Sequence, residues 1–124
     1  EFHSAKPYPE YHTSDDSLEI IDPARLEESV QVVLRALRIL DEDRYPKRRY
    51  RGTVQLSSYG LWVDWRVDPK LNEKIDRLMW SFEGDRSLTQ IALELELPFD
   101  TVRDYVARFA DAGLVTLGSE PWTR

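Results

Sequence analysis

The stretch that decides the fold is Asp85–Leu117, DRSLTQIALELELPFDTVRDYVARFADAGLVTL. Its first half predicts a short helix after Ser87, because the Ser87 hydroxyl can accept from the Gln90 amide while the Gln90 side chain reaches back to the cap. Apolar residues then recur at the spacing of one helix face. Pro98 ends the run, since the residue before a proline is pushed out of the α region. The residues of this face are Leu88, Ile91, Ala92 and Leu95.

A second helix is predicted after Pro98, ending before Gly113, the residue best able to take the left-handed conformation past a helix end. Its apolar residues are Val102, Val106, Phe109 and Ala110. With Gly113 just outside the helix, Phe109 and Leu114 are expected to form the hydrophobic pair of a Schellman motif. Two helices joined by a tight turn and followed by a strand at Leu114–Leu117 are typical of a helix-turn-helix that enters a wing. The sequence therefore predicts a winged-helix module.

The chain of 124 residues with 41% hydrophobic content is long enough to bury a core. We expect a mainly α fold with a small β-sheet, in which the winged helix-turn-helix is preceded by a long helix and an extended N-terminal arm. The expected parts are an arm at residues 1–21, a long helix, basic linker and short strands at 22–67, and the winged-helix module at 68–124.

Cysteine is absent, which is compatible with a reducing cytoplasm, and this is the location we expect. No apolar run approaches the roughly 20 residues of a membrane span, and the start lacks the basic and apolar regions of a signal peptide. We therefore expect a soluble chain without membrane contact.

Asp22 followed by Pro23 predicts the start of the long helix, since Asp is a preferred cap and Pro suits the first helical position. Apolar residues then repeat at spacings of four and three up to the acidic residues at 41–43. This seam consists of Leu26, Val30, Val33, Leu37 and Leu40. We expect the seam to need a partner surface, which is the C-terminal module, an absent domain or a second copy of the chain paired through the helix 23–40.

Two further elements are expected before the helix pair. Residues 53–65 are rich in β-branched and aromatic side chains and predict one or two short strands. Asp68 and Pro69 repeat the cap-plus-proline pattern and predict a helix that ends at Gly84. The apolar face of that helix consists of Leu71, Ile75, Leu78 and Phe82, with Met79 beside it. The four tryptophans are expected in the core or at an interface.

The run RYPKRRYR, residues 44–51, concentrates positive charge in a chain whose formal net charge is −6. Its cations are Arg44, Lys47, Arg48, Arg49 and Arg51, with Tyr45 and Tyr50 between them. Such a run can follow a phosphate backbone and stack bases, which makes it a candidate nucleic-acid or partner patch. It can also be a solvated linker whose charges pair with Asp41, Glu42 and Asp43 or with a neighbouring domain, and we favour this interpretation.

The segment PEYHTSDDSL, residues 9–18, carries the residue types best suited to metal chemistry. His12 has small neighbours and nearby carboxylates, a combination that suits a metal ligand supported by hydrogen-bonded acids. A histidine in a proline-containing arm is, however, more often solvated or packed in a loop. The residues alone leave both interpretations open.

PEYHTSDDSL resembles the closing metal-ligand segment of the two-zinc aminopeptidases, in which a Tyr-His-Thr-Ser-x-Asp-x-Leu pattern supplies the last histidine ligand. Here the pattern is formed by Tyr11, His12, Thr13, Ser14, Asp16 and Leu18. The sequence after this segment is similar to one uncharacterised branch of that family, in which the segment leads into a long helix, a Gly-Leu-Tyr-type strand and a C-terminal winged helix. Residues 59–62 stand at that strand, and residues 78–99 resemble the opening of the winged helix.

The resemblance implies that His12 is a zinc ligand and that Asp16 helps to orient the loop or the imidazole. No catalytic residue transfers, because the other ligands and the general base of the family lie upstream of this segment. Zinc catalysis needs about three protein ligands and an open position for water. We therefore expect the isolated chain to be inactive and to bind zinc only together with an upstream peptidase domain. His3 lies outside the pattern and is expected to be an ordinary arm residue.

Nucleic-acid binding is the competing class, because winged helices often place their second helix in the major groove of DNA. The charged residues of that helix are Asp100, Asp104 and Asp111 against Arg103 and Arg108. Duplex binding draws most of its affinity from the neutralisation of phosphates, so this acidic helix predicts protein contacts and makes duplex DNA an unfavourable partner. The alternative is a free-standing winged-helix module that binds nucleic acid or a protein.

Overall fold

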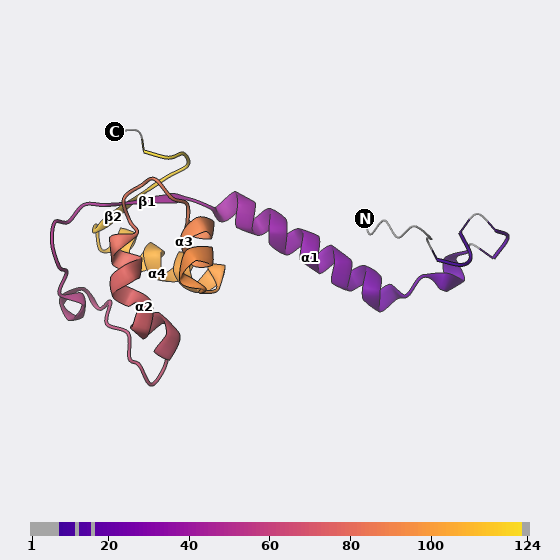
Figure 1. Cartoon of the computed structure of the whole chain (residues 1–124), viewed down its shortest axis with the longest axis horizontal. Coiled ribbons are helices and arrows are strands. Elements are labelled where there is room, and N and C mark those ends of the chain that lie inside the picture. Colours follow the sequence, from indigo (N-terminus) through magenta and orange to yellow (C-terminus); the bar gives the residue numbers. More distant parts are fainter. Residues whose placement is uncertain (1–7, 12, 16, 123–124) are drawn as a thin grey trace. The chain divides into compact units, whose positions relative to one another are not determined.

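The computed structural model describes residues 8–11, 13–15 and 17–122 (Figure 1). The protein is mainly α-helical with one small antiparallel sheet, as the sequence predicted. In chain order, the elements are η1 (Leu18–Ile20), α1 (Pro23–Glu42), β1 (Tyr45–Arg48), η2 (Leu56–Tyr59), α2 (Pro69–Trp80), α3 (Leu88–Leu95), α4 (Phe99–Asp111) and β2 (Val115–Gly118). The chain divides into two compact units, Glu1–Arg38 (unit 1) and Ile39–Arg124 (unit 2). Over the described ranges, no helix combines the length and the apolar character needed to cross a bilayer.

Unit 1 consists of the arm and most of α1. Asp22 caps this helix as predicted, because its Oδ1 accepts from the amides of Ala24 at 2.9 Å and Arg25 at 3.4 Å. No residue of α1 is buried, and all five residues of the predicted seam are exposed. In the arm, the rings of Tyr8 and Tyr11 meet edge to face with centroids 5.7 Å apart. The described part of unit 1 therefore contains no hydrophobic core.

Unit 2 is built around a hydrophobic core that α2, α3 and α4 share, and Figure 1 shows these helices beside β1 and β2. The aromatic centre of this core is Phe109, whose ring lies edge to face with Phe82 at 5.6 Å and with Tyr105 at 5.2 Å. The predicted apolar faces of all three helices are buried. Their fully buried members include Leu78, Phe82, Leu88, Ile91, Leu95, Val102, Val106 and Phe109.

The predicted helix starts in unit 2 are present. Asp68 caps α2 by accepting from the Leu71 amide at 2.9 Å. The capping box of α3 is complete, because the Gln90 amide donates to the Ser87 hydroxyl at 3.4 Å and the Ser87 amide donates to the Gln90 side chain at 2.8 Å. Helix α2 ends at Trp80, before the predicted stop at Gly84.

The ends of α3 and α4 are both Schellman motifs. At the end of α4, the Gly113 amide donates to the Ala110 carbonyl and the Leu114 amide donates to the Phe109 carbonyl, each at 2.9 Å. This confirms the predicted Schellman motif at Gly113, and Phe109 and Leu114 are both buried in the core. Helix α3 ends in the same way at Glu96, which has a positive φ of 52°. The helix therefore stops two residues before Pro98, at a non-glycine residue in the left-handed region.

The sheet pairs β1 with β2, so that Tyr45 lies opposite Gly118 and Arg48 lies opposite Val115. The sequence predicted a strand at 114–117 that enters a wing, and the strand is present one residue later. Its partner was not predicted, because residues 44–51 were interpreted as a linker. The amides of Arg48 and Arg49 donate to the carbonyls of Phe82 and Leu114, each at 2.8 Å. These partners come from distant parts of the sequence, so no local pattern signals the strand.

The strands predicted within residues 53–65 are absent, and this prediction was wrong. The segment forms η2, a turn with Gly60 in the left-handed conformation, and irregular backbone. Side chains take up backbone carbonyls that a strand would use, since Tyr105 donates to the Leu61 carbonyl at 2.7 Å and Asn72 donates to the Val63 carbonyl at 2.8 Å. The apolar pattern reflects burial of Leu61 and Val63 in the core.

Trp122, which follows β2, contacts β1 and the loop after α2. Its amide donates to the Gly84 carbonyl at 2.9 Å and its indole Nε1 donates to the Tyr45 carbonyl at 3.2 Å. A Cβ on Gly84 would lie 2.6 Å from Trp122 Cδ1, and a Cβ on Gly118 would lie 2.9 Å from Trp122 Nε1. Both glycines therefore allow the indole to approach the backbone.

Candidate functional site

The basic residues of the predicted patch lie on and around β1. Strand geometry sends successive side chains to opposite faces. Pro46 is buried, while Lys47 and Arg48 are half-buried and Arg49 and Arg51 are exposed. The pairing of β1 with β2 makes this run part of a folded sheet, and the interpretation as a solvated linker is corrected.

Arg44 begins the run, and its side chain contacts the C-terminal end of α1. Its Nη1 donates to the carbonyls of Asp41 at 2.7 Å and Asp43 at 2.8 Å. The predicted pairing with the carboxylates of these residues is replaced by contacts with their backbone, and Asp43 Oδ1 instead accepts from the Thr89 amide at 2.9 Å. Arg44 thus closes the last turn of a helix, where unpaired carbonyls attract a cation.

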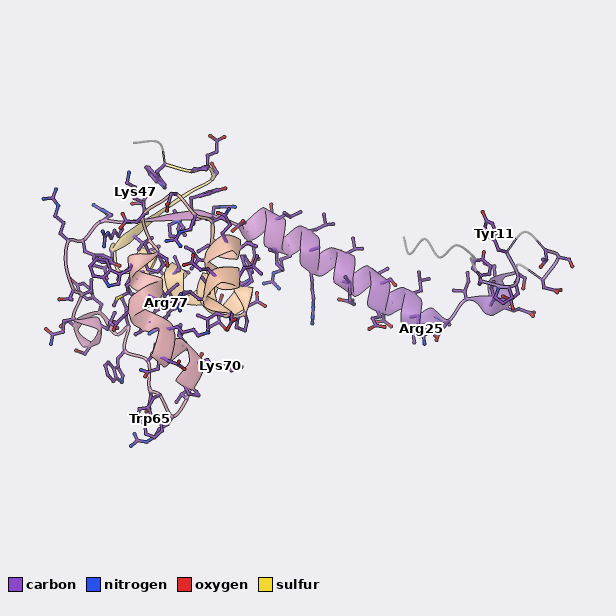
Figure 2. All side chains as sticks on the ribbon, in the orientation of Figure 1. Tyr11, Arg25, Lys47, Trp65, Lys70 and Arg77 are labelled. Atoms are coloured by element: carbon purple, nitrogen blue, oxygen red, sulfur yellow. The ribbon has the colours of Figure 1, made fainter. Side chains whose placement is uncertain are left out.

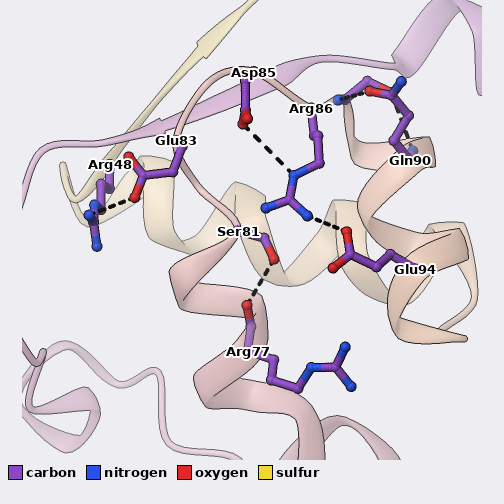
Figure 3. Close-up of polar contacts among 9 residues, drawn as sticks. Arg48, Arg77, Ser81, Glu83, Asp85, Arg86, Gln90 and Glu94 are labelled. Carbon is purple, nitrogen blue, oxygen red and sulfur yellow. Dashed lines mark hydrogen bonds and ion pairs between the residues drawn. The ribbon is translucent and has the colours of Figure 1, made fainter.

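Arg48 is held by an acid and an aromatic ring. Its Nη2 lies 2.6 Å from Glu83 Oε1, and its guanidinium lies 5.0 Å from the centroid of the Trp80 ring. Figure 3 shows the Arg48–Glu83 pair beside the end of α2. A paired and stacked guanidinium is a poorer phosphate ligand than a free one, because a new anion must displace Glu83.

The remaining cations of the run differ in their surroundings. Lys47 Nζ lies 5.0 Å from the centroid of the Trp122 ring, a cation–π contact. Arg49 and Arg51 are exposed, so they are the members of the patch best placed to meet a partner.

The two tyrosines of the run, Tyr45 and Tyr50, are both half-buried. The Tyr50 hydroxyl donates to the Met79 carbonyl at 2.9 Å and its ring packs against the core. Burial raises the pKa of Tyr50 to about 12, although nearby Arg48 lowers it. Tyr45 is half-buried, and its carbonyl accepts from Trp122. Both tyrosines are thus partly covered, which leaves less of each ring for base stacking.

Helix α4 carries an acidic surface with its arginines occupied. Arg103 lies 2.8 Å from carboxylate oxygens of both Asp100 and Asp104, and it also pairs with Glu42. Hydrogen bonds to Asp104 and Glu42 raise the pKa of Arg103. One cation among three carboxylates leaves a local excess of negative charge, which disfavours phosphate.

The second arginine of α4 is also engaged. Arg108 donates to the Gly60 carbonyl and its guanidinium lies 5.4 Å from the centroid of the Tyr105 ring. Tyr105 itself is buried, and burial raises its pKa. Both arginines of the helix therefore already have partners within unit 2.

The four tryptophans are all exposed, so the expectation that they belong to the core is wrong and the alternative, an interface, stays a prediction. Their exposed fractions are 64% for Trp62, 59% for Trp65, 54% for Trp80 and 38% for Trp122. Trp65 lies on the loop that precedes α2 (Figure 2). Exposed tryptophans are more frequent at binding surfaces than on the rest of a protein surface.

The predicted metal ligand His12 and its neighbour Asp16 lie outside the described residues. Tyr11 and Thr13, which flank His12 in the sequence, are exposed, and the Thr13 hydroxyl donates to the Glu10 carbonyl at 2.7 Å. Within residues 8–11, 13–15 and 17–122, no group of three His, Cys, Asp or Glu side chains is placed to hold a metal ion. The zinc prediction thus stays a prediction.

The sequence reasoning missed the residues that surround the basic run: Trp80, Glu83 and Trp122. They lie far from β1 in the sequence and reach it only because β1 pairs with β2 and bridges to Glu83 through Lys47. Residues 45–50 hold three consecutive basic residues and no strand-like alternation, so the sequence carried no local signal for these neighbours.

Comparison with known protein families gives one match, over the arm and α1. A model described as a domain of unknown function, DUF4910, matches residues 2–43. The match is compatible with a fragment of a larger protein and carries no link to aminopeptidases. No curated protein and no solved structure matches the chain.

Proposed function

We propose that the chain is the C-terminal part of a two-zinc aminopeptidase-like protein, in which unit 2 is a winged-helix domain that mediates protein contacts. His12 supplies one zinc ligand, Asp16 orients it, and the catalytic residues lie upstream. The resemblance of residues 9–18 to the metal-ligand segment is the source of this proposal. Bound zinc would polarise a carbonyl and activate water. The chain by itself is not catalytic.

The observation that carries the proposal is α1, a helix of 20 residues with none buried. It follows the His12 segment directly, and the family match at residues 2–43 spans both. Isolated helices derive most of their stability from packing of an amphipathic face. An exposed face of this length supports the view that residues 1–43 belong to a larger domain.

The width of this face favours an upstream domain over a second copy of the chain. At about 100° per residue, the five seam residues and Leu34 cover an arc of about 120°. Leu34 is exposed like the seam residues. A stripe wider than about 100° is typical of a helix that packs on a globular core, whereas a two-helix coiled coil uses a narrower seam.

The assignment of unit 2 to protein contacts is supported by its charges. Arg103 and Arg108 are engaged within the unit, and Asp100 and Asp104 are exposed near the first turns of α4. A DNA-reading helix needs groups there that contact bases and phosphates. We place the protein in the cytoplasm, on the basis of its lack of cysteine.

The test is to express the chain with its upstream coding region and to measure zinc content and aminopeptidase activity. We expect bound zinc and activity, both strongly reduced by His12→Ala. His3→Ala is the matched control and should retain both, because His3 lies outside the ligand pattern. Tight stoichiometric zinc binding by the 124 residues alone, measured by titration calorimetry, would contradict the proposal.

Docking of α1 is tested separately by Val33→Asp in the same longer protein, with Gln31→Asp as the control on the polar face of the helix. Val33→Asp should lower the melting temperature of the longer protein, and Gln31→Asp should not. If the seam instead pairs between copies, light scattering of the 124-residue chain should give a dimer that Val33→Asp disrupts. Dimer formation would contradict the preference for an upstream domain.

Nucleic-acid binding is the second candidate, and the exposure of Arg49 and Arg51 is the observation in its favour. Fluorescence anisotropy with labelled duplex and single-stranded DNA distinguishes the two functions. We expect no binding at physiological salt. Submicromolar affinity that is weakened by Arg49→Ala and Arg51→Ala would favour the second candidate.

A further inference from the structure

A small hollow lies beside the end of α2 in unit 2. Its volume is about 160 Å³, which suits one side-chain group and is too small for a drug-sized ligand. The residues that line it come from α2 and from the chain that follows β1. They are Tyr50, Gly52, Thr53, Asp76, Met79 and Trp80.

Two aromatic side chains contribute to the wall of this hollow. Trp80 is 54% exposed, so its indole is accessible to a partner. Tyr50 is fixed by the hydrogen bond that its hydroxyl donates to the Met79 carbonyl at 2.9 Å. The faces of such rings carry negative electrostatic potential and attract cations.

The same hollow is lined by a carboxylate, that of Asp76. Asp76 is exposed on α2 and makes no ion pair or hydrogen bond through its side chain with another described residue. Other acids close to this end of α2 are engaged: Glu83 pairs with Arg48, and Glu94 pairs with Arg86 (Figure 3). Asp76 is therefore the carboxylate available to a ligand in the hollow.

The cation seen closest to the Trp80 ring is paired with an acid. Arg48 lies 5.0 Å from the centroid of the Trp80 ring and 2.6 Å from Glu83. Arg77 and Arg86 line a different hollow of about 240 Å³ that Trp80 also borders. Asp76 is the charged residue among the described residues that line the first hollow, whereas the second hollow is lined by Arg77, Arg86 and Glu94.

We propose that the hollow formed by Tyr50, Asp76, Met79 and Trp80 binds an ammonium group, such as a lysine or methylated lysine side chain of a partner. The cation would lie against the ring of Trp80 and pair with Asp76, as in other aromatic sites for alkylammonium ions. An exposed site of this size binds the isolated group weakly, with a dissociation constant in the millimolar range, because association entropy offsets most of the contact energy.

The experiment is an NMR titration of the 124-residue chain with tetramethylammonium chloride at constant ionic strength. We expect the Trp80 indole N–H and the Asp76 amide signals to shift with saturation. The uncharged analogue tert-butanol and additional sodium chloride should leave them unshifted. Equal shifts with tert-butanol would show an apolar hollow without cation selectivity and would overturn the proposal.

Variants then assign the effect to the two groups. Asp76→Asn should weaken tetramethylammonium binding about fivefold, and Trp80→Ala should abolish it. Asp111→Asn and Trp65→Ala are the matched controls, because both residues are exposed elsewhere on unit 2, and they should bind as the parent does. Trp80→Phe keeps a ring if Trp80→Ala perturbs folding, and it should retain partial binding. Unchanged affinity in Asp76→Asn would overturn the proposal.

The source of the ammonium group is distinguished by two further ligands. A short peptide with one trimethyllysine that binds at least tenfold more tightly than choline would support a protein partner. Equal affinities would support a free alkylammonium ligand in the same site. Shifts confined to residues outside the hollow with both ligands would contradict the assignment.

Discussion

Helices α1 and α4 show the same apolar periodicity and have opposite surroundings. Each is amphipathic and each begins with a sharp start at or after a proline. In α4, four residues are buried in the core, whereas in α1 none is buried. This difference shows that the spacing of apolar residues predicts where a helix forms and which of its faces is apolar. It does not predict where the partner of that face lies.

Capping residues predict the starts of helices equally well in the two units. Asp22 caps α1 and Ser87 caps α3, each through the hydrogen bonds that its sequence context predicts. Capping contributes about 1 kcal/mol, whereas a buried aromatic side chain contributes several times more. We therefore expect the unfolding free energy of the 124-residue chain to come mainly from the core of unit 2. Helix α1 should contribute little to it, because none of its residues is buried.

The largest effect is expected when a core aromatic is removed. Phe109→Ala should destabilise unit 2 by about 3–5 kcal/mol, because Phe109 is fully buried and contacts the rings of Phe82 and Tyr105. The measurement is chemical denaturation followed by circular dichroism.

Leu37→Ala in α1 is the matched control. It should change the unfolding free energy by less than about 0.5 kcal/mol, since Leu37 is exposed. If Leu37→Ala were as destabilising as Phe109→Ala, the face of α1 would be packed within the 124 residues and the contrast between the two helices would be lost.

Much of unit 2 could be predicted from the sequence because its signals are local. The capping box at Ser87, the cap at Asp68 and the Schellman motif at Gly113 each involve residues within one or two helical turns. Strand β1 could not be predicted in this way. Its ladder partners are Val115–Gly118, and Pro46 and the basic residues within it have low strand propensity.

The candidate site was predicted less well than the fold. The basic run was found from its charge, but the neighbours that restrain Lys47 and Arg48 lie far away in the sequence. Asp76 and Trp80 gave no signal, because they stand on the polar face of α2 and become a site only when the chain after β1 folds beside them. The prediction for His12 depends on resemblance and falls outside the described residues.

The next effect tests the contact between Gly84 and Trp122 in unit 2, whereas no residue of α1 is buried. Gly84→Ala should destabilise unit 2 by about 2 kcal/mol, because Gly84 has a φ of +86° and a Cβ would lie 2.6 Å from Trp122 Cδ1. Gly113→Ala is the control with a similar φ of +72° and open space, and it should cost about 1 kcal/mol. Thermal melting measures both. Equal losses would show that the Trp122 contact adds nothing.

A smaller effect is expected when the N-terminal cap of α3 or of α1 is removed. Ser87→Ala should lower the unfolding free energy of unit 2 by about 1 kcal/mol, since it removes one side of the capping box. Asp22→Ala removes a cap of similar geometry from α1 and should reduce helical content without moving the main unfolding transition. Circular dichroism at equilibrium and during denaturation distinguishes the two results. A shift of the main transition in Asp22→Ala would mean that α1 unfolds together with unit 2.

The smallest effect concerns Glu96, the non-glycine residue that ends α3. Its φ of 52° costs an ordinary side chain about 1 kcal/mol, which glycine avoids. Glu96→Gly also removes an ion pair with Lys74, whose Nζ lies 3.7 Å from the Glu96 carboxylate, but the Glu96 side chain is 87% exposed and such pairs contribute about 0.5 kcal/mol or less. The expected result is therefore a net stabilisation of about 0.5 kcal/mol, measured as a higher denaturation midpoint with an unchanged slope. Glu96→Gln is the control, because it removes the charge and keeps the backbone strain, and it should be neutral or slightly destabilising. A loss of stability in Glu96→Gly larger than in Glu96→Gln would show that the ion pair outweighs the strain, and that α3 is held at this end by a side chain and not by its backbone.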